Sequence, residues 1–254
     1  MENTYLSHEE LTALHQVFLT SNIKYIKKHL SQHSSEKIIN SIIRIIRGNS
    51  SSDMNMYETL FLADNLDINQ PSSLGGDTLL YSATVVNNLW MVKDLIARGA
   101  DVNACCINGS YPLLSASLNQ NRLEILEFLL EKGADPNIVT NSGDTCLTHC
   151  VKNNSPLLLS KLIQAGADVN FLDRNHRSCL EHAIYANFTE NILVLCQSAK
   201  DQTQIEQFKN QAKNLQDSLS YDFTINVLNS IELKLNLDST LPKSNTLKHK
   251  NHKI

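Results

Sequence analysis

Cysteines and histidines that recur at matching spacings are the residues of this sequence best suited to chemistry. Cys146 and His149 stand three residues apart, and Cys179 and His182 repeat that spacing further along the chain. On a helix such a pair shares one face, and thiolate and imidazole are both zinc ligands. Equivalent positions on neighbouring packed helices lie about 10 Å apart, however, which is too far for one ion. We therefore predict that these residues serve packing and that the chain holds no metal ligands, with a Cys/His metal-binding module as the alternative.

Motifs for nucleophilic or phosphate chemistry are absent from the sequence. It contains no G-x-S-x-G, no H-E-x-x-H and no glycine loop that would cradle a phosphate. The adjacent thiols of Cys105 and Cys106 have no nearby base that would activate them. We therefore predict no catalytic residues, no cofactor and no enzymatic activity. An enzyme or modifier acting through helices at the two ends of the chain is the alternative.

Charge and hydropathy exclude further classes. The 254 residues carry a net charge of −4, without the basic field of nucleic-acid-binding proteins, and the lysines of 24–29 are typical of a solvated helix face. No stretch reaches the roughly 18 apolar residues of a membrane span. The start, MENTYLSHEE, lacks the apolar core of a classical signal peptide, and six cysteines in so long a chain favour a reducing compartment. We expect a cytoplasmic monomer that binds no nucleic acid.

Two sequence blocks recur with one period. They indicate which secondary-structure elements position the cysteines and histidines described above. A turn occurs as RGADVNA, KGADPN and AGADVN, with its glycines at Gly99, Gly133 and Gly166, 34 and 33 residues apart. A second block keeps the same period, reading GDTLLYSA, GSYPLLSA, GDTCLTHC and HRSCLEHA. Between the blocks, segments such as RLEILEFLLE have apolar residues at three- and four-residue steps, which predicts helices with one buried stripe.

These blocks resemble ankyrin repeats, whose pattern is G-x-T-P-L-H-x-A, a helix and then G-A-D-V-N. The resemblance implies an all-α solenoid of stacked helix-turn-helix units with helical caps at both ends. We expect a degenerate helical region at 1–72, ankyrin repeats at 73–199, a helical cap at 200–237 and a disordered basic tail at 238–254. In ADNLDIN, Asn65 takes the slot of the turn glycine, where a left-handed backbone is expected. Thr78, Thr145 and Ser178 are expected to cap helices, and Pro112 to begin one.

The resemblance also implies where a partner binds, because ankyrin stacks use the concave side formed by hairpin tips and first helices. Counting from the glycine of each block assigns the following partner-binding residues: Asp77, Ile107, Asn108, Ser110, Leu118, Asn141, Asp144, Lys152, Arg174, Asn175, Arg177 and Tyr185. Arg and Tyr often supply interface energy, so we expect the end that carries Arg174, Arg177 and Tyr185 to contact an acidic or polar patch.

The predicted function is therefore that of a scaffold or adaptor that binds another protein through its concave surface. The chain is rich in Asn, Ile, Lys and Ser, which resembles ankyrin proteins of intracellular bacteria that are delivered into host cells as effectors. That resemblance implies a host protein as the partner and secretion without a classical signal peptide. A cytosolic eukaryotic adaptor is the alternative.

Overall fold

Helices form the whole framework of the described chain. The computed structural model describes residues 4–20, 22–48 and 53–240, and divides into two compact units, Met1–His176 and Arg177–Ile254. The first unit contains α1 (His8–Leu19), α2 (Ile23–Leu30), α3 (Ser35–Gly48), α4 (Asp53–Leu60), α5 (Leu79–Val85), α6 (Leu89–Ala97), α7 (Pro112–Ser117), the 3₁₀ turn η1 (Gln120–Arg122), α8 (Leu123–Glu131), α9 (Cys146–Lys152) and α10 (Pro156–Gln164). The second contains α11 (Cys179–Tyr185), α12 (Thr189–Gln197), α13 (Gln202–Lys213) and α14 (Tyr221–Thr240). Among the described residues, no helix is long and apolar enough to cross a bilayer.

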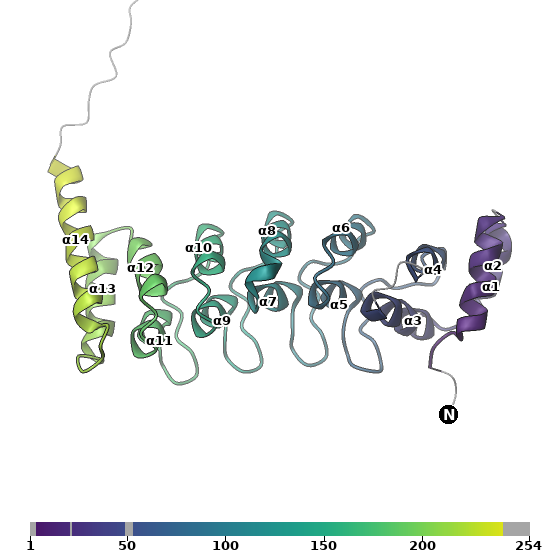
Figure 1. Ribbon diagram of the computed structural model, residues 1–254, viewed down its shortest axis with the longest axis horizontal. Helices are drawn as coiled ribbons and strands as arrows, with labels where there is room; N and C mark the ends of the chain where they lie inside the picture. The colour runs from purple at the N-terminus through teal and green to yellow at the C-terminus, as the bar shows by residue number, and fades with distance from the viewer. Residues whose placement is uncertain (1–3, 21, 49–52, 241–254) are drawn as a thin grey trace, which may run out of the picture. The chain divides into compact units, whose positions relative to one another are not determined.

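The helices of the first unit form pairs, and successive pairs pack on one another. Figure 1 shows α5 with α6, α7 with α8, and α9 with α10, with the loops between pairs extending on one side. The second helix of each pair contributes a fully buried leucine, Leu95, Leu129 and Leu162 in turn. A single pair cannot bury its own apolar face, so stacking is what removes these side chains from water. The predicted all-α repeat solenoid is confirmed.

Local sequence signals set the helix ends as predicted. The Thr78 and Thr145 hydroxyls accept hydrogen bonds from the backbone N–H groups of Tyr81 and Thr148, and Ser178 caps α11 in the same way. Such bonds satisfy N–H groups that have no partner within the helix. Pro112 is the first residue of α7, where its missing N–H costs nothing.

The recurring turn couples one repeat to the next through its asparagine. The glycines of the three turns have positive φ, at 97° for Gly99, 87° for Gly133 and 93° for Gly166, a conformation that glycine adopts without strain. Asn103 then spans two turns: its Nδ2 donates to the Gly133 carbonyl, 3.2 Å away, and its Oδ1 accepts from the N–H of Asp135 at 2.9 Å. Asn69 and Asn137 make the equivalent pairs of bonds in the flanking turns. The turn is thus a hydrogen-bonded clamp between neighbours.

The N-terminal part of the first unit, where the sequence predicts a degenerate helical region, contains helices α1 to α4. The prediction of a left-handed backbone at Asn65 is wrong, because Asn65 is not among the described residues with positive φ. Its side chain instead donates to the carbonyl of His33 at 3.1 Å. Trp90 of α6 meets Tyr57 of α4 edge-on and stays 49% exposed.

The second unit packs its long helices over a short pair. Helix α11 packs against α12 and α13, and α14 packs against α12 and α13. Phe208 of α13 and Leu228 of α14 are fully buried within this unit. Helix α14 continues to Thr240, two residues past the predicted start of the tail, and residues 241–254 of that predicted tail lie outside the described residues.

Candidate protein-interaction surface

A row of exposed side chains crosses the hairpin tips of the first unit. Leu74, Ile107, Asn141 and Arg174 occupy the same slot in four successive loops. Leu74 and Ile107 are 49% and 73% exposed, and Asn141 and Arg174 are also exposed. We call these four residues the tip row. Two large apolar side chains facing solvent at regular spacing are a feature that a partner can cover.

Each of the last three members of the tip row lies over the glycine of the preceding loop. The N–H of Ile107 donates to the Gly76 carbonyl at 2.9 Å, and a Cβ built on Gly76 would lie 2.6 Å from the Ile107 Cβ. Gly109 faces Asn141, and Gly143 faces Arg174, with the same lack of room for a Cβ. Glycine is required here both by this contact and by a positive φ.

Hydrogen bonds connect the polar half of the tip row from loop to loop. The Asn141 Nδ2 donates to the Asn108 carbonyl at 3.1 Å, and the Arg174 guanidinium donates to the Asn141 carbonyl. Asn108 is held in turn, because its Oδ1 accepts from the N–H of Ser110 at 2.9 Å. The side chains are therefore ordered before a partner arrives, which lowers the entropic cost of binding.

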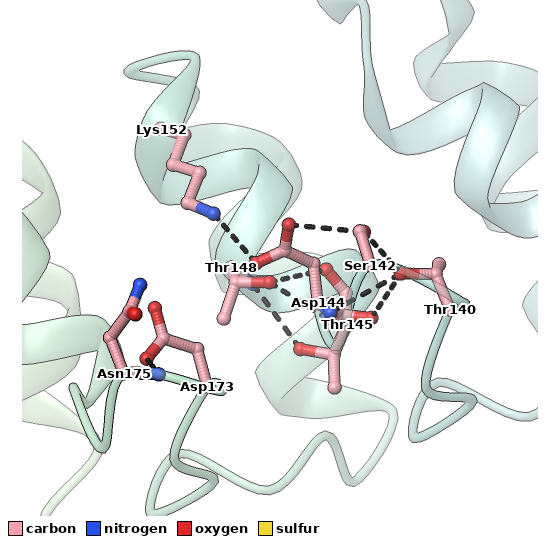
Figure 2. A network of polar contacts seen from close by, with 8 residues as sticks. All are labelled: Thr140, Ser142, Asp144, Thr145, Thr148, Lys152, Asp173 and Asn175. Carbon is pink, nitrogen blue, oxygen red and sulfur yellow. Dashed lines mark hydrogen bonds and ion pairs between the residues drawn. The ribbon is translucent and has the colours of Figure 1, made fainter.

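Beside the third loop, Asp144 lies at the centre of a polar network (Figure 2). Lys152 of α9 places its Nζ 2.6 Å from Asp144 Oδ1, and the Ser142 hydroxyl donates to Oδ2 at 3.3 Å. Thr140 accepts the N–H of Asp144 and contacts the Ser142 hydroxyl at 2.8 Å. Partial burial, the largest single effect, acts to raise the pKa of Asp144, but the hydrogen bond and charge of Lys152, together with His149 and Ser142, lower it overall. The network fixes an ionised carboxylate at the rim of the loop.

Asp77, the first predicted partner-binding residue, is placed differently. It is only 7% exposed, and its carboxylate forms an ion pair with Arg47 of α3. Burial raises its pKa, with the charge of Arg47 acting in the opposite direction. Asp77 lines a cavity of about 260 Å³ together with Arg44, Arg47 and Tyr5. The only sequence signal for these arginines is their position on the polar face of an isoleucine-rich helix, and no repeat pattern marks them.

The remaining predicted residues lie at or near the surface. Leu118 is 44% exposed, Asn108, Lys152 and Asn175 are exposed, and Ser110 is half-buried. Figure 2 shows Asn175 next to Asp173, whose carboxylate accepts its N–H at 2.8 Å. In the second unit, the Arg177 guanidinium carbon lies 6.0 Å from the centroid of the Tyr185 ring, which is 74% exposed. Such a cation–π pair holds both groups ready for contact.

The cysteines of the last two repeats are part of the core. Cys146, Cys150 and Cys179 are buried, and burial raises the pKa of Cys146 to about 12. Metals bind thiolates, so a buried thiol of this kind is a poor ligand. His149 is half-buried, and burial lowers its pKa. Of the residues that the structure describes, no compact group of three potential ligands includes these side chains.

Stacked helix pairs, joined by asparagine hydrogen bonds from turn to turn, define a helical repeat protein. A family model described as ankyrin repeats (3 copies) matches residues 2–140 and 113–206. The chain belongs to the ankyrin-repeat family. A comparison with curated proteins finds no match.

Proposed function

We propose that the protein is a non-enzymatic scaffold that binds another protein along the tip row and the adjoining first helices. The observation that carries this proposal is the ordering of the row: exposed side chains at equivalent positions are held in place by contacts between loops. Ankyrin repeats generally act in protein interactions. Asp77 is left out of the proposed surface because Arg47 neutralises it.

The chemistry of the row suggests a partner with two features. Leu74 and Ile107 offer apolar area at one end, and Arg174 offers a cation at the other. A segment with an apolar side chain followed by an acidic group would match this order. Arg177 and Tyr185 of the second unit supply a further cation and aromatic ring.

In its more specific form, the proposal is that a bacterium delivers this chain into a host cell and that the partner is a host-cell protein. Its support is the composition, rich in Asn, Ile, Lys and Ser. Affinity purification with the full chain as bait is run in parallel on host lysate and on bacterial lysate. It shows which of the two lysates contains the partner. Recovery of a specific partner only from bacterial lysate contradicts the host-protein form while leaving the scaffold proposal intact.

Variants of the tip row test the binding surface. Ile107→Arg should lower partner affinity at least tenfold while preserving the fold, because the same slot already carries an arginine at 174. Charge reversal at both Arg174 and Arg177 should weaken binding to a similar extent. Matched controls are Leu157→Arg, at a 50% exposed leucine of α10, and Lys24→Glu, at an exposed lysine of α2. Unchanged affinity in the tip variants, or equal loss in the controls, would overturn the assignment.

A further inference from the structure

Three potential metal ligands converge at the N-terminal end of the first unit. Glu10 belongs to α1, His29 to the last turn of α2, and His33 to the turn that precedes α3. One carboxylate oxygen and one ring nitrogen from each histidine lie within 4.8 Å of one another, and all three residues are half-buried. The imidazole centroids are 5.3 Å apart with the rings edge to face.

Both histidines have an unsatisfied buried nitrogen. His29 Nε2 and His33 Nε2 are inaccessible to solvent and find no hydrogen-bond partner among the described residues. Buried polar atoms are nearly always paired, because leaving one unpaired costs free energy. Two such atoms on adjacent rings beside a carboxylate indicate that a ligand satisfies them.

The carboxylate is fixed and charged. Glu10 Oε2 accepts the N–H of Ser7 at 2.6 Å, completing a capping box at the start of α1. This bond is the main reason that the pKa of Glu10 is lowered, with smaller contributions from the Ser7 hydroxyl and from Lys37 and His33. Burial lowers the pKa of His33, and the charges of Lys37 and His29 add to that effect while Glu10 opposes it. The bond to Ser7 therefore holds the Glu10 carboxylate in place beside the two imidazoles.

We propose that Glu10, His29 and His33 form a binding site for one divalent transition-metal ion of the Zn²⁺ type. Two imidazoles and one carboxylate are a donor set that suits Zn²⁺, Ni²⁺ and Cu²⁺ better than Ca²⁺ or Mg²⁺, which prefer oxygen ligands. Zinc ligands stand at about 2.0–2.2 Å from the ion, so ligand atoms up to 4.8 Å apart must close by roughly 1 Å. The two half-buried imidazoles supply that movement while Glu10 keeps its bond to Ser7, and water takes the fourth position.

The surroundings admit an ion and suggest its role. A cavity of about 290 Å³ is lined by Glu9, Glu10, His29 and Tyr25, so it lies beside two of the three ligands. The three ligands come from α1, α2 and the following turn, so the ion ties together the first helices of the stack. The role of the ion is structural. The sequence-based expectation of no metal considered only the Cys and His residues of the repeats. The positive charge of Lys37, which acts on Glu10 and His33, repels a cation bound at this site.

Titration of the tag-free full chain with Zn²⁺, in competition with a chromophoric chelator, tests the site. We expect one equivalent to bind, affinity to fall at least tenfold in His29→Gln, His33→Gln and Glu10→Gln, and Lys37→Gln to bind severalfold more tightly. Glutamine still supports a capping box, so Glu10→Gln leaves α1 capped. His15→Gln is the matched control, because His15 also has a buried unpaired nitrogen but lies outside the cluster.

A second measurement on the unaltered chain separates this site from the thiols. Co²⁺ should give the visible bands of nitrogen and oxygen coordination without sulfur charge-transfer bands, and Zn²⁺ should raise the melting temperature. The absence of saturable Zn²⁺ binding, wild-type affinity in both histidine variants, or a sulfur charge-transfer band lost in Cys105→Ser would each overturn the proposal. If a histidine variant fails to fold, the Co²⁺ spectrum of the unaltered chain and the Zn²⁺ titration of Lys37→Gln still test whether the site exists.

Discussion

At the scale of single residues, the glycines of the first unit act in two ways that the structure separates. Gly109 and Gly133 both have positive φ, at 79° and 87°. A Cβ on Gly109 would meet the Asn141 side chain, whereas one on Gly133 would meet nothing within 4 Å. Gly109 is needed both for its backbone conformation and for the space that the Asn141 side chain occupies, whereas Gly133 is needed for its conformation alone.

Alanine at these two positions should therefore give different losses of stability. Gly133→Ala should lower the free energy of unfolding by about 1 kcal/mol, the cost of a left-handed backbone at a residue with a Cβ. Gly109→Ala should cost about 1 kcal/mol more, because Asn141 must also move. Urea unfolding measures both values, and equal losses would show that the contact between loops carries no energy.

Asp144 should make stability depend on pH in the acidic range. Its folded pKa lies below the ordinary 3.8, so its ionised form stabilises the fold above that pH, and the benefit is lost as the pH falls through the folded pKa. Asp144→Asn should cost about 0.5–1 kcal/mol at pH 7, as for a partly exposed ion pair. The difference from wild type should shrink below pH 3.8 in urea titrations. A difference that persists at low pH would contradict the ionic explanation, and Lys152→Met should reproduce the loss at pH 7.

At the scale of elements, the short first helices depend on their caps. Helix α5 has only seven residues, and the Thr78 hydroxyl accepts the N–H of Tyr81 at 3.2 Å. Isolated helices of this length are unstable. Thr78→Ala should therefore lower the free energy of unfolding by about 1 kcal/mol, and Thr78→Ser should retain most of it. Chemical denaturation compares the two, and an equal loss in both would assign the effect to the lost methyl group.

Caps and repeats were readable from the sequence because they depend on local geometry. The 33- and 34-residue period marks the stacked pairs, and Thr78, Thr145 and Pro112 each act within one turn of their own position. Between α7 and α8, where one spacing of the period is 34 and not 33, the chain forms the 3₁₀ turn η1. Asn65 was predicted wrongly because its conformation depends on packing near His33, which no local pattern encodes.

Long-range pairing also limited the prediction of the surface. The pattern placed Ile107, Asn141 and Arg174 at exposed tips, where the structure has them. It also named Asp77, whose partner Arg47 comes from a degenerate repeat 30 residues earlier. Likewise, the cluster of Glu10 with His29 and His33 combines residues from α1, from α2 and from the turn before α3, which share no repeat register. Contacts of this kind follow from the fold and not from the period.

At the scale of the molecule, contacts in a repeat stack join neighbouring repeats. A destabilising substitution should therefore lower stability mainly in its own repeat and the adjacent ones. Leu126 of α8 is fully buried, and α8 packs against α6, α7, η1 and α10. Leu126→Ala should cost about 2–5 kcal/mol through lost burial and the cavity left behind. In a quasi-one-dimensional stack the loss falls first on the altered repeat and its neighbours.

Native-state hydrogen exchange can locate that loss. Amide protection should fall in α5 to α10 of the Leu126→Ala variant while α1 and α2, which are not among the main packing partners of α8, keep theirs. Leu157→Ala, at an exposed leucine of α10, is the matched control and should change protection little. A uniform fall across the first unit would mean that all its helices unfold as one cooperative body. A scaffold that reads its partner over several loops would then lose its whole binding surface at once, whereas local unfolding leaves the remaining tips in place.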